Sequence, residues 1–163
     1  MGYLLDSNVF IEAKNHYYGF DFCPAFWDWI DAAYRAERVF SVEKVGEELF
    51  DYGDELATWA KERSKTATFF LKPDDAVRDS LVVVAQWANS QTYTPAAINE
   101  FLQAADFYLV AHALAHGHVA VTRERLDPNA RKKIQIPNAC EGVGAQWMDP
   151  YAMLRAEKVK FVI

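Results

Sequence analysis

Four acidic side chains spread along the sequence have the chemistry of a divalent-metal site. They are Asp6, Glu48, Asp106 and Glu124. Magnesium prefers hard oxygen ligands, binds few protein carboxylates and keeps several of its own waters, so three or four acids with exchangeable water suit it. The set predicts a magnesium site, provided that the fold brings the four side chains together.

Each of these acids also has an ordinary structural explanation when it is taken alone. Asp6 would cap a helix, and Asp106 would be a first-turn acid that the helix dipole favours. Glu48 and Glu124 would be solvated surface charges. The functional interpretation therefore depends on the set, and on where its members stand relative to the predicted strands.

The acids cluster around the ends of predicted strands. Residues 3–5 are apolar and precede Asp6, while residues 118–122 form a β-branched, apolar strand followed by Glu124. Asp106 begins the helical pattern that leads into this second strand and closes on a glycine. Because ligands bind outside the carboxyl ends of parallel strands, we expect these acids to share one crevice.

The remaining pattern alternates strands with helices. Further strands are predicted at residues 38–41, 69–71 and 133–136, and helices at 23–37, 42–59, 74–88, 106–117 and 151–156. Glu48 lies on the second of these helices and could project toward the same crevice. Such alternation predicts an α/β fold with a mostly parallel central sheet covered on both faces, a three-layer α/β/α sandwich. The length of 163 residues suits a single domain over residues 1–163.

Composition excludes several classes of protein. An apolar fraction of 52% with 11 Phe, 8 Tyr and 5 Trp is too high for a disordered chain. No apolar run is long enough to span a membrane, and the first residues lack a signal-peptide pattern, so we expect a soluble cytoplasmic protein without a membrane partner. A net charge of −6 argues against a sequence-blind grip on long nucleic acid, although it does not exclude a nuclease.

Other residue types that carry chemistry have two interpretations each. Cys23 and Cys140 are expected to be reduced and structural. The aromatic side chains of Tyr17, Tyr18 and Trp27 could stack on unpaired bases, but a place in the core is favoured. The histidines show no metal-binding spacing, and His112 and His116 are expected on the outer face of a helix. A basic cluster is either a phosphate track or a solvated loop; it comprises Arg123, Arg125, Arg131, Lys132 and Lys133.

The acids also lie in segments that resemble the motifs of PIN-domain ribonucleases. Residues 4–10 (LLDSNVF) are similar to the opening strand and acidic turn of that family, where Asp-Thr-Asn is usual. Residues 45–49 (VGEEL) resemble the second motif, and the position before the leucine selects Glu48 rather than Glu47. Residues 105–111 (ADFYLVA) and 121–124 (VTRE) resemble the third and fourth motifs. The four occur in family order and span about three quarters of the chain.

Two more segments, residues 17–21 (YYGFD) and 136–140 (IPNAC), are similar to an uncharacterised bacterial and archaeal branch of PIN-like proteins. The wider family implies RNA cleavage that depends on Mg²⁺ or Mn²⁺ and leaves a 5′ phosphate. Asp6 and Asp106 would be the principal metal ligands, with Asn8 and Thr122 fixing them by hydrogen bonds. Many small PIN proteins are toxins with a cognate antitoxin, and many dimerise, so the resemblance makes both an antitoxin and a homodimer candidate partners.

Two positions depart from the family pattern. Ser7 replaces the usual threonine and keeps the hydroxyl. Glu124 replaces the commoner aspartate, which lengthens its reach by one methylene and could leave it acting on the metal only through water. This departure, with the negative net charge, leaves open a binding module that has lost turnover. A phosphatase of the Asp-x-Asp type is a weaker alternative, because position 8 is asparagine.

Overall fold

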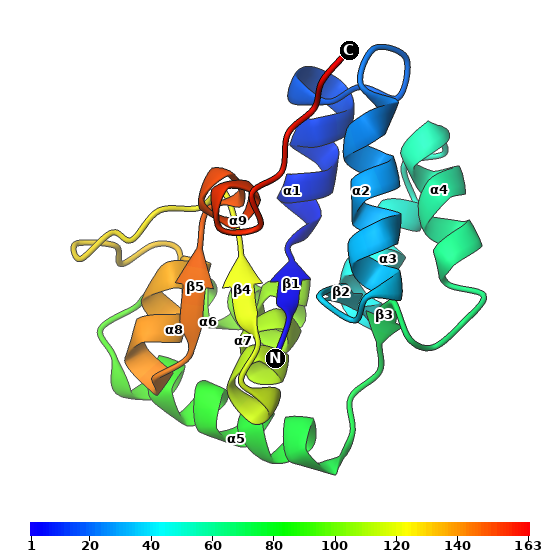
Figure 1. Ribbon diagram of the computed structural model, residues 1–163. Helices are drawn as coiled ribbons and strands as arrows, with labels where there is room; N and C mark the ends of the chain where they lie inside the picture. The colour runs from blue at the N-terminus through cyan, green and yellow to red at the C-terminus, as the bar shows by residue number, and fades with distance from the viewer.

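The computed structural model describes residues 1–163 and shows an α/β fold with five parallel strands in one central sheet (Figure 1). The strands are short and largely buried, as parallel strands covered on both faces must be. They are β1 (Tyr3–Leu5), β2 (Val39–Val42), β3 (Phe70–Leu71), β4 (Val119–Val121) and β5 (Gln146–Met148).

Helices flank the sheet on both faces and complete the three-layer α/β/α sandwich that the sequence predicts (Figure 1). The first half of the chain forms α1 (Ser7–Glu12), the π-helical turn η1 (Ala13–Tyr17), α2 (Pro24–Arg35), α3 (Glu43–Phe50) and α4 (Glu55–Arg63). The second half forms α5 (Asp75–Ser90), α6 (Pro95–Gln103), α7 (Ala105–His116), α8 (Ile136–Val143) and α9 (Pro150–Ala156).

The strand order is β3-β2-β1-β4-β5, so the direction in which the chain adds strands reverses between β1 and β4. Leu5 of β1 lies beside Val121 of β4, which aligns the carboxyl ends of the two central strands. In open parallel sheets the ligand crevice forms at this reversal, because the connections leave toward opposite faces. The topology therefore selects the residues that follow β1 and β4 as the candidate site.

The core is a single cluster rich in aromatic side chains. Phe10, Trp59 and Phe69 pack with ring centroids 5.5 to 6.4 Å apart, joining α1, α4 and the start of β3. Trp27 is also buried, in line with the core interpretation, whereas Tyr17 is exposed. This core holds the elements around β1 rigidly, which is what a site built on strand ends requires.

Two predicted elements are wrong and one strand is missed. The single helix expected over residues 42–59 is divided into α3 and α4 by a turn at residues 51–54. Residues 133–136 are not a strand: they lead into α8, whose first turn contains Pro137. The error is understandable, because Ile134 and Ile136 are both buried and imitate the alternation of a strand. The missed strand is β5, which is only three residues long and lies at the edge of the sheet.

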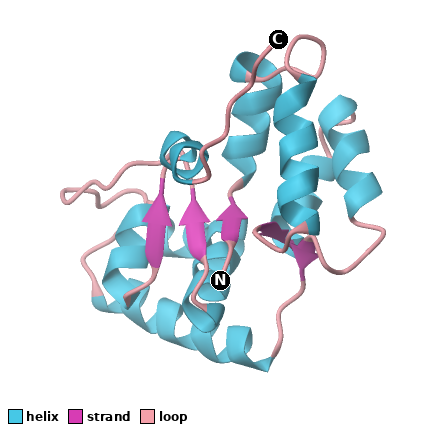
Figure 2. Cartoon of the chain, in the orientation of Figure 1, coloured by secondary structure: helices cyan, strands magenta, loops and turns pink.

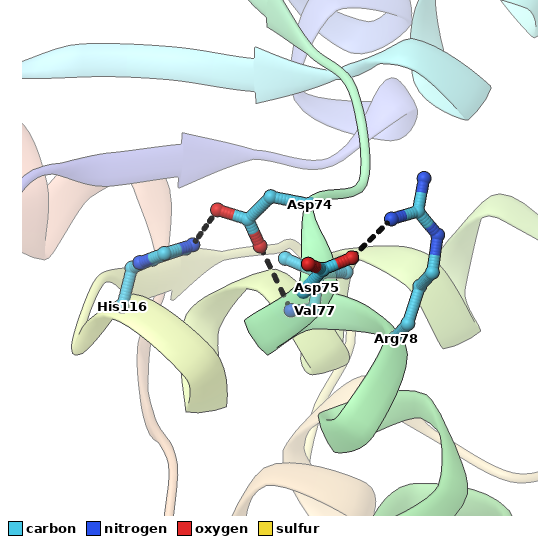
Figure 3. Close-up of polar contacts among 5 residues, drawn as sticks. All are labelled: Asp74, Asp75, Val77, Arg78 and His116. Atoms are coloured by element: carbon cyan, nitrogen blue, oxygen red, sulfur yellow. Dashed lines mark hydrogen bonds and ion pairs between the residues drawn. The ribbon is translucent and has the colours of Figure 1, made fainter.

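The amino-terminal end of the sheet is closed by paired polar groups. Asp74 accepts a hydrogen bond from the backbone N–H of Val77 at 2.9 Å, capping α5, and its other carboxylate oxygen lies 2.8 Å from Nε2 of His116 on α7 (Figure 3). Arg78 pairs with Asp75 one turn away. Gly2 N–H donates to Nδ1 of His118 at 2.9 Å. These contacts fasten α5 to α7 and β4 to the start of the chain.

His112 corrects the expectation that both α7 histidines face outward. His116 is exposed, but His112 is only 2% exposed, and its Nε2 has no hydrogen-bond partner. The helix packs against α5 and also against α6 and α8, and burial lowers the pKa of the His112 imidazole to about 4. The helical pattern alone could not show this, because α7 is covered on more than one side.

No helix is both long enough and apolar enough to cross a membrane.

Candidate functional site

Asp6 occupies the carboxyl end of β1, at the centre of the strand reversal. Its backbone N–H donates to the Val121 carbonyl oxygen at 2.9 Å, which continues the β1–β4 pairing to this residue. The side chain is 2% exposed and accepts hydrogen bonds from the hydroxyls of Thr122, at 3.0 Å, and Ser7, at 3.4 Å. Although Asp6 stands at the N-cap position of α1, its carboxylate makes no capping bond.

Thr122 links the ends of the two central strands. Its Oγ1 donates to Asp6 Oδ2 and accepts from the backbone N–H of Glu124 at 3.1 Å. The same hydroxyl thus orients one candidate ligand and fixes the turn that presents another. Asn8, expected to assist in the same way, is exposed and makes no side-chain hydrogen bond.

Glu124 leaves β4 and turns toward α8. Its Oε2 lies 3.4 Å from the backbone nitrogen of Ile136, the first residue of that helix. The Glu124 side chain thus contacts the first turn of α8. The side chain is half-buried, and Lys133 partly balances its charge.

Asp106 lies in the first turn of α7, where the helix dipole favours a negative charge. The side chain is half-buried and makes no hydrogen bond within the protein. It shares a small cavity of about 30 Å³ with Lys133 and the apolar residues Ala97 and Ile134. A desolvated carboxylate without a hydrogen bond is costly, and Lys133 is the cation of the protein that lines the same cavity.

The neighbouring glutamates of α3 have different environments. Glu47 is exposed and pairs with Lys44 at 3.3 Å. Glu48 is exposed as well, but it makes no ion pair, and its charge acts on both Asp6 and Asp106. Of the two, Glu48 is therefore the one whose charge acts on Asp6 and Asp106.

The charges of Glu48 and Glu124 act on both Asp6 and Asp106. Burial, followed by the charge of Glu124, raises the pKa of Asp6 to about 7 despite the hydrogen bond from Thr122. Burial, followed by the charge of Asp6, raises the pKa of Asp106 to about 8. The pKa of Glu124 is raised by burial too. Near pH 7 Asp6 and Asp106 are therefore partly protonated, and a bound cation would displace these protons.

The side chains do not form a ready-made ion cage. Three or more His, Cys, Asp or Glu residues are nowhere grouped closely enough to hold a metal as they stand. Magnesium often binds through only one or two carboxylates and fills its other positions with water. The candidate direct ligands are accordingly Asp6 and Asp106, with Glu48 and Glu124 acting across water.

The five residues of the basic cluster lie on the long loop between β4 and α8, which projects from the body of the protein (Figure 2). They do not form one continuous group. Lys133 lies beside Asp106. Arg123 and Arg125 line a cavity of about 260 Å³ together with Glu124. Arg131 lines a separate cavity, and Lys132 is exposed. Three of the five cations thus flank the acids.

Tyr151 is a residue that the sequence did not single out. Its hydroxyl accepts a hydrogen bond from Arg123 Nη1 at 3.1 Å, and Tyr17 holds the same guanidinium, 4.7 Å from its ring centroid. The two tyrosine rings meet edge to face. This arrangement fixes an arginine beside Glu124; no motif in the sequence around Tyr151 could have indicated it.

The two cysteines are free, as expected. Cys140 is buried on α8, and burial raises the pKa of its thiol to about 12, which leaves it unreactive. Cys23 is half-buried just before α2. Neither contributes to the acidic site.

Comparison with known proteins gives one match. No curated protein and no solved structure matches the chain. A protein family described as a domain of unknown function, DUF4411, matches residues 3–161 and so covers nearly every element, including all four candidate acids. The chain therefore belongs to the DUF4411 family.

Proposed function

We propose that this protein is a ribonuclease that depends on Mg²⁺ or Mn²⁺. The observation that carries the proposal is a pair of aspartates near the reversal point of the sheet, the buried Asp6 and the half-buried Asp106, whose pKa values are raised to about 7 and about 8. A protein core does not keep two repelling carboxylates together without a compensating charge. The ordered resemblance to PIN-domain motifs gives the reaction class.

In this proposal Asp6 and Asp106 hold the ion. When bound, a divalent ion lowers the pKa of a water and offsets negative charge on the departing oxygen. Glu48 completes the ligand set or orients the attacking water, and Glu124 acts directly or through water. Thr122 keeps the Asp6 carboxylate in place through its 3.0 Å hydrogen bond.

The cations beside the acids are suited to the substrate phosphates. Lys133 lies next to Asp106, and Arg123 is held by two tyrosines near Glu124. A fixed guanidinium can hold a phosphate with little further loss of side-chain entropy. We therefore propose that the scissile phosphate lies between these two cations. A toxin role with a cognate antitoxin and a homodimer belong to the same proposal on the family resemblance alone, and a cytoplasmic location on the sequence pattern.

A catalytically silent binding module is the second candidate. It is favoured by the lack of any ready-made group of three metal donors and by the contact between Glu124 and α8. Such a protein would keep the fold and bind RNA or protein without cleaving it. The two candidates differ in whether a divalent ion binds at the aspartates.

The test is cleavage of single-stranded and structured RNA by the purified chain in Mg²⁺ and in Mn²⁺. We expect cleavage that EDTA abolishes and that Asp106→Asn lacks, with calorimetry showing ion binding to the wild type only. Equal cleavage by both proteins would reveal a contaminating nuclease and defeat the proposal. Ion binding without any cleavage would favour the silent module, and turnover of nucleotide monophosphates but not RNA would favour a phosphatase.

A further inference from the structure

A sizeable cavity lies away from the four acids. It has a volume of about 460 Å³, within the range of pockets that hold small ligands. It is bounded by the carboxyl-terminal part of α5 and the following turn, by the loop after Glu124, and by α8. None of the four acids lines this cavity, so the metal proposal leaves it unexplained.

Two aromatic rings form one wall of the cavity. Trp87 of α5 and Tyr93 of the turn after it meet at 62° with ring centroids 5.8 Å apart. The indole lies directly against α8 at Gly142, where a Cβ atom would overlap the ring atoms Nε1 and Cε2. The glycine thus permits a close approach that sets the position of the Trp87 ring. Aromatic faces of this kind stack on nucleobases.

Groups of opposite charge complete the lining. Glu141 of α8 makes no hydrogen bond or ion pair within the protein, and an ionised carboxylate can only accept. Arg131 donates through Nη1 to the Ala130 carbonyl oxygen at 2.8 Å, and its other guanidinium nitrogens have no partner in the protein. An aromatic wall, a free acceptor and a free cation in one cavity match a base, its donor edge and its phosphate.

The donor edge selects among the bases. Guanine presents two adjacent N–H donors on its Watson–Crick edge, which a carboxylate accepts together. Adenine and cytosine place a lone-pair acceptor beside their amino group, and uracil flanks its single N–H with carbonyls. A carboxylate is repelled by those oxygen and nitrogen lone pairs. Among RNA bases, Glu141 therefore favours guanine.

The cavity lies close to the acidic site because two residues that are near in the sequence line the two places. Leu126 lines the cavity and stands two residues after Glu124, within about 7 Å along an extended backbone. A single strand of RNA with its scissile phosphate at the acids can therefore place a nearby unstacked base in the cavity.

We propose that the cavity between Trp87, Arg131 and Glu141 is a guanine-nucleotide subsite that selects where the RNA is cut. This inference rests on the proposed ribonuclease function for its role in cleavage, but not for binding itself. The probe is guanosine 5′-monophosphate, titrated by calorimetry into the metal-free protein in EDTA, with the adenosine and uridine monophosphates beside it. We expect the guanosine nucleotide to bind at least about tenfold more tightly than the other two.

Three variants locate the binding. Glu141→Gln should weaken the guanosine nucleotide about tenfold and leave the others unchanged, because only guanine uses the carboxylate. Trp87→Leu should weaken all three about tenfold through lost stacking. Gly142→Ala favours the helix but displaces the indole, and it should weaken all three as well. Asp79→Asn, on the same helix as Trp87, is the matched control and should bind like the wild type.

Outcomes separate this inference from the ribonuclease proposal. Guanosine nucleotide binding that is lost in Glu141→Gln supports the subsite even if no RNA is cleaved, in which case the nuclease proposal fails alone. Metal-dependent cleavage with no saturable nucleotide binding, and with an unchanged cleavage pattern in Glu141→Gln, overturns the subsite alone. Equal affinity for all three nucleotides also overturns it.

Discussion

The two ends of the central sheet treat their polar groups in opposite ways. At the amino-terminal end, Asp74 is paired with His116 and caps α5, and His118 accepts from the backbone of Gly2. At the carboxyl-terminal end, burial and neighbouring acids raise the pKa of Asp6 and of Asp106, and Asp106 has no hydrogen-bond partner. The acid at one end is paired within the protein, whereas the acids at the other end repel one another and, in our proposal, bind a divalent ion.

This contrast is informative because folding does not require it. Buried polar groups are normally hydrogen-bonded, and exceptions are concentrated where a protein binds or reacts. His112 is an exception at the satisfied end, since its Nε2 is buried without a partner. Burying an unpaired neutral imidazole costs far less free energy than placing a second desolvated carboxylate beside Asp6.

The largest expected difference between the two ends is in activity. Asp6→Asn at the carboxyl-terminal end should lower the rate of RNA cleavage at least about a thousandfold, because it removes a metal ligand worth several kcal/mol in the transition state. Asp74→Asn at the amino-terminal end keeps a capping side chain and should leave the rate within about threefold. Single-turnover cleavage in Mn²⁺ measures both. Similar losses in the two variants would show that the contrast has no catalytic meaning.

A smaller effect should separate the adjacent glutamates of α3. Glu48→Gln should slow cleavage about 10- to 100-fold, since its charge acts on both aspartates. Glu47→Gln should leave the rate unchanged, since Glu47 forms an ion pair with Lys44 on the surface. Rates measured at several Mn²⁺ concentrations would show whether Glu48 acts through metal affinity. A slower Glu47 variant beside a normal Glu48 variant would reverse the assignment.

The metal-free protein should reveal the electrostatic cost of the acidic site. Because the pKa of Asp106 is raised to about 8 by burial and then by the charge of Asp6, its contribution to stability is full below pH 4 and is lost as the pH rises toward 8. In EDTA, the free energy of unfolding of Asp106→Asn should therefore be about 2 kcal/mol higher than that of the wild type at pH 8. At pH 4 the two values should be equal.

Urea unfolding across this pH range gives the measurement, and added Mg²⁺ should stabilise the wild type but not the variant. Parallel pH profiles for the two proteins in EDTA would mean that Asp106 is not strained in the folded state.

The smallest effect is expected at His112. Burial lowers the pKa of its imidazole to about 4, so its contribution to stability is present above the ordinary value near 6.5 and is lost as the pH falls toward 4. His112→Leu removes the unpaired nitrogen. When the pH falls from 7 to 5.5, the free energy of unfolding should therefore decrease by about 1 kcal/mol less in this variant than in the wild type. Thermal unfolding at both pH values measures this. An unchanged acid sensitivity would place the titrating group elsewhere.

Much of the fold could be predicted because its elements carry local signals. The strand before Asp6, the helix that ends at Gly117 and the strand after it all follow from apolar spacing and a glycine cap with φ of 68°. The prediction of a strand at residues 133–136 was wrong. The two buried isoleucines of this segment lead into helix α8 and do not pair with a neighbouring strand. Local spacing cannot distinguish these cases, since both bury alternate residues.

The sequence by itself determined which residues could form the acidic site, because acids that follow strands of a parallel sheet must meet at one edge. Only the tertiary structure decided how they meet. It buries Asp6 and gives it a hydrogen bond from the Thr122 hydroxyl. It leaves Asp106 without a hydrogen-bond partner and turns Glu124 toward α8. It also sets Trp87 against Gly142, 55 positions further along the chain, and so forms a cavity that no motif announces. Burial and long-range contact create these properties, and neither is encoded in local residue spacing.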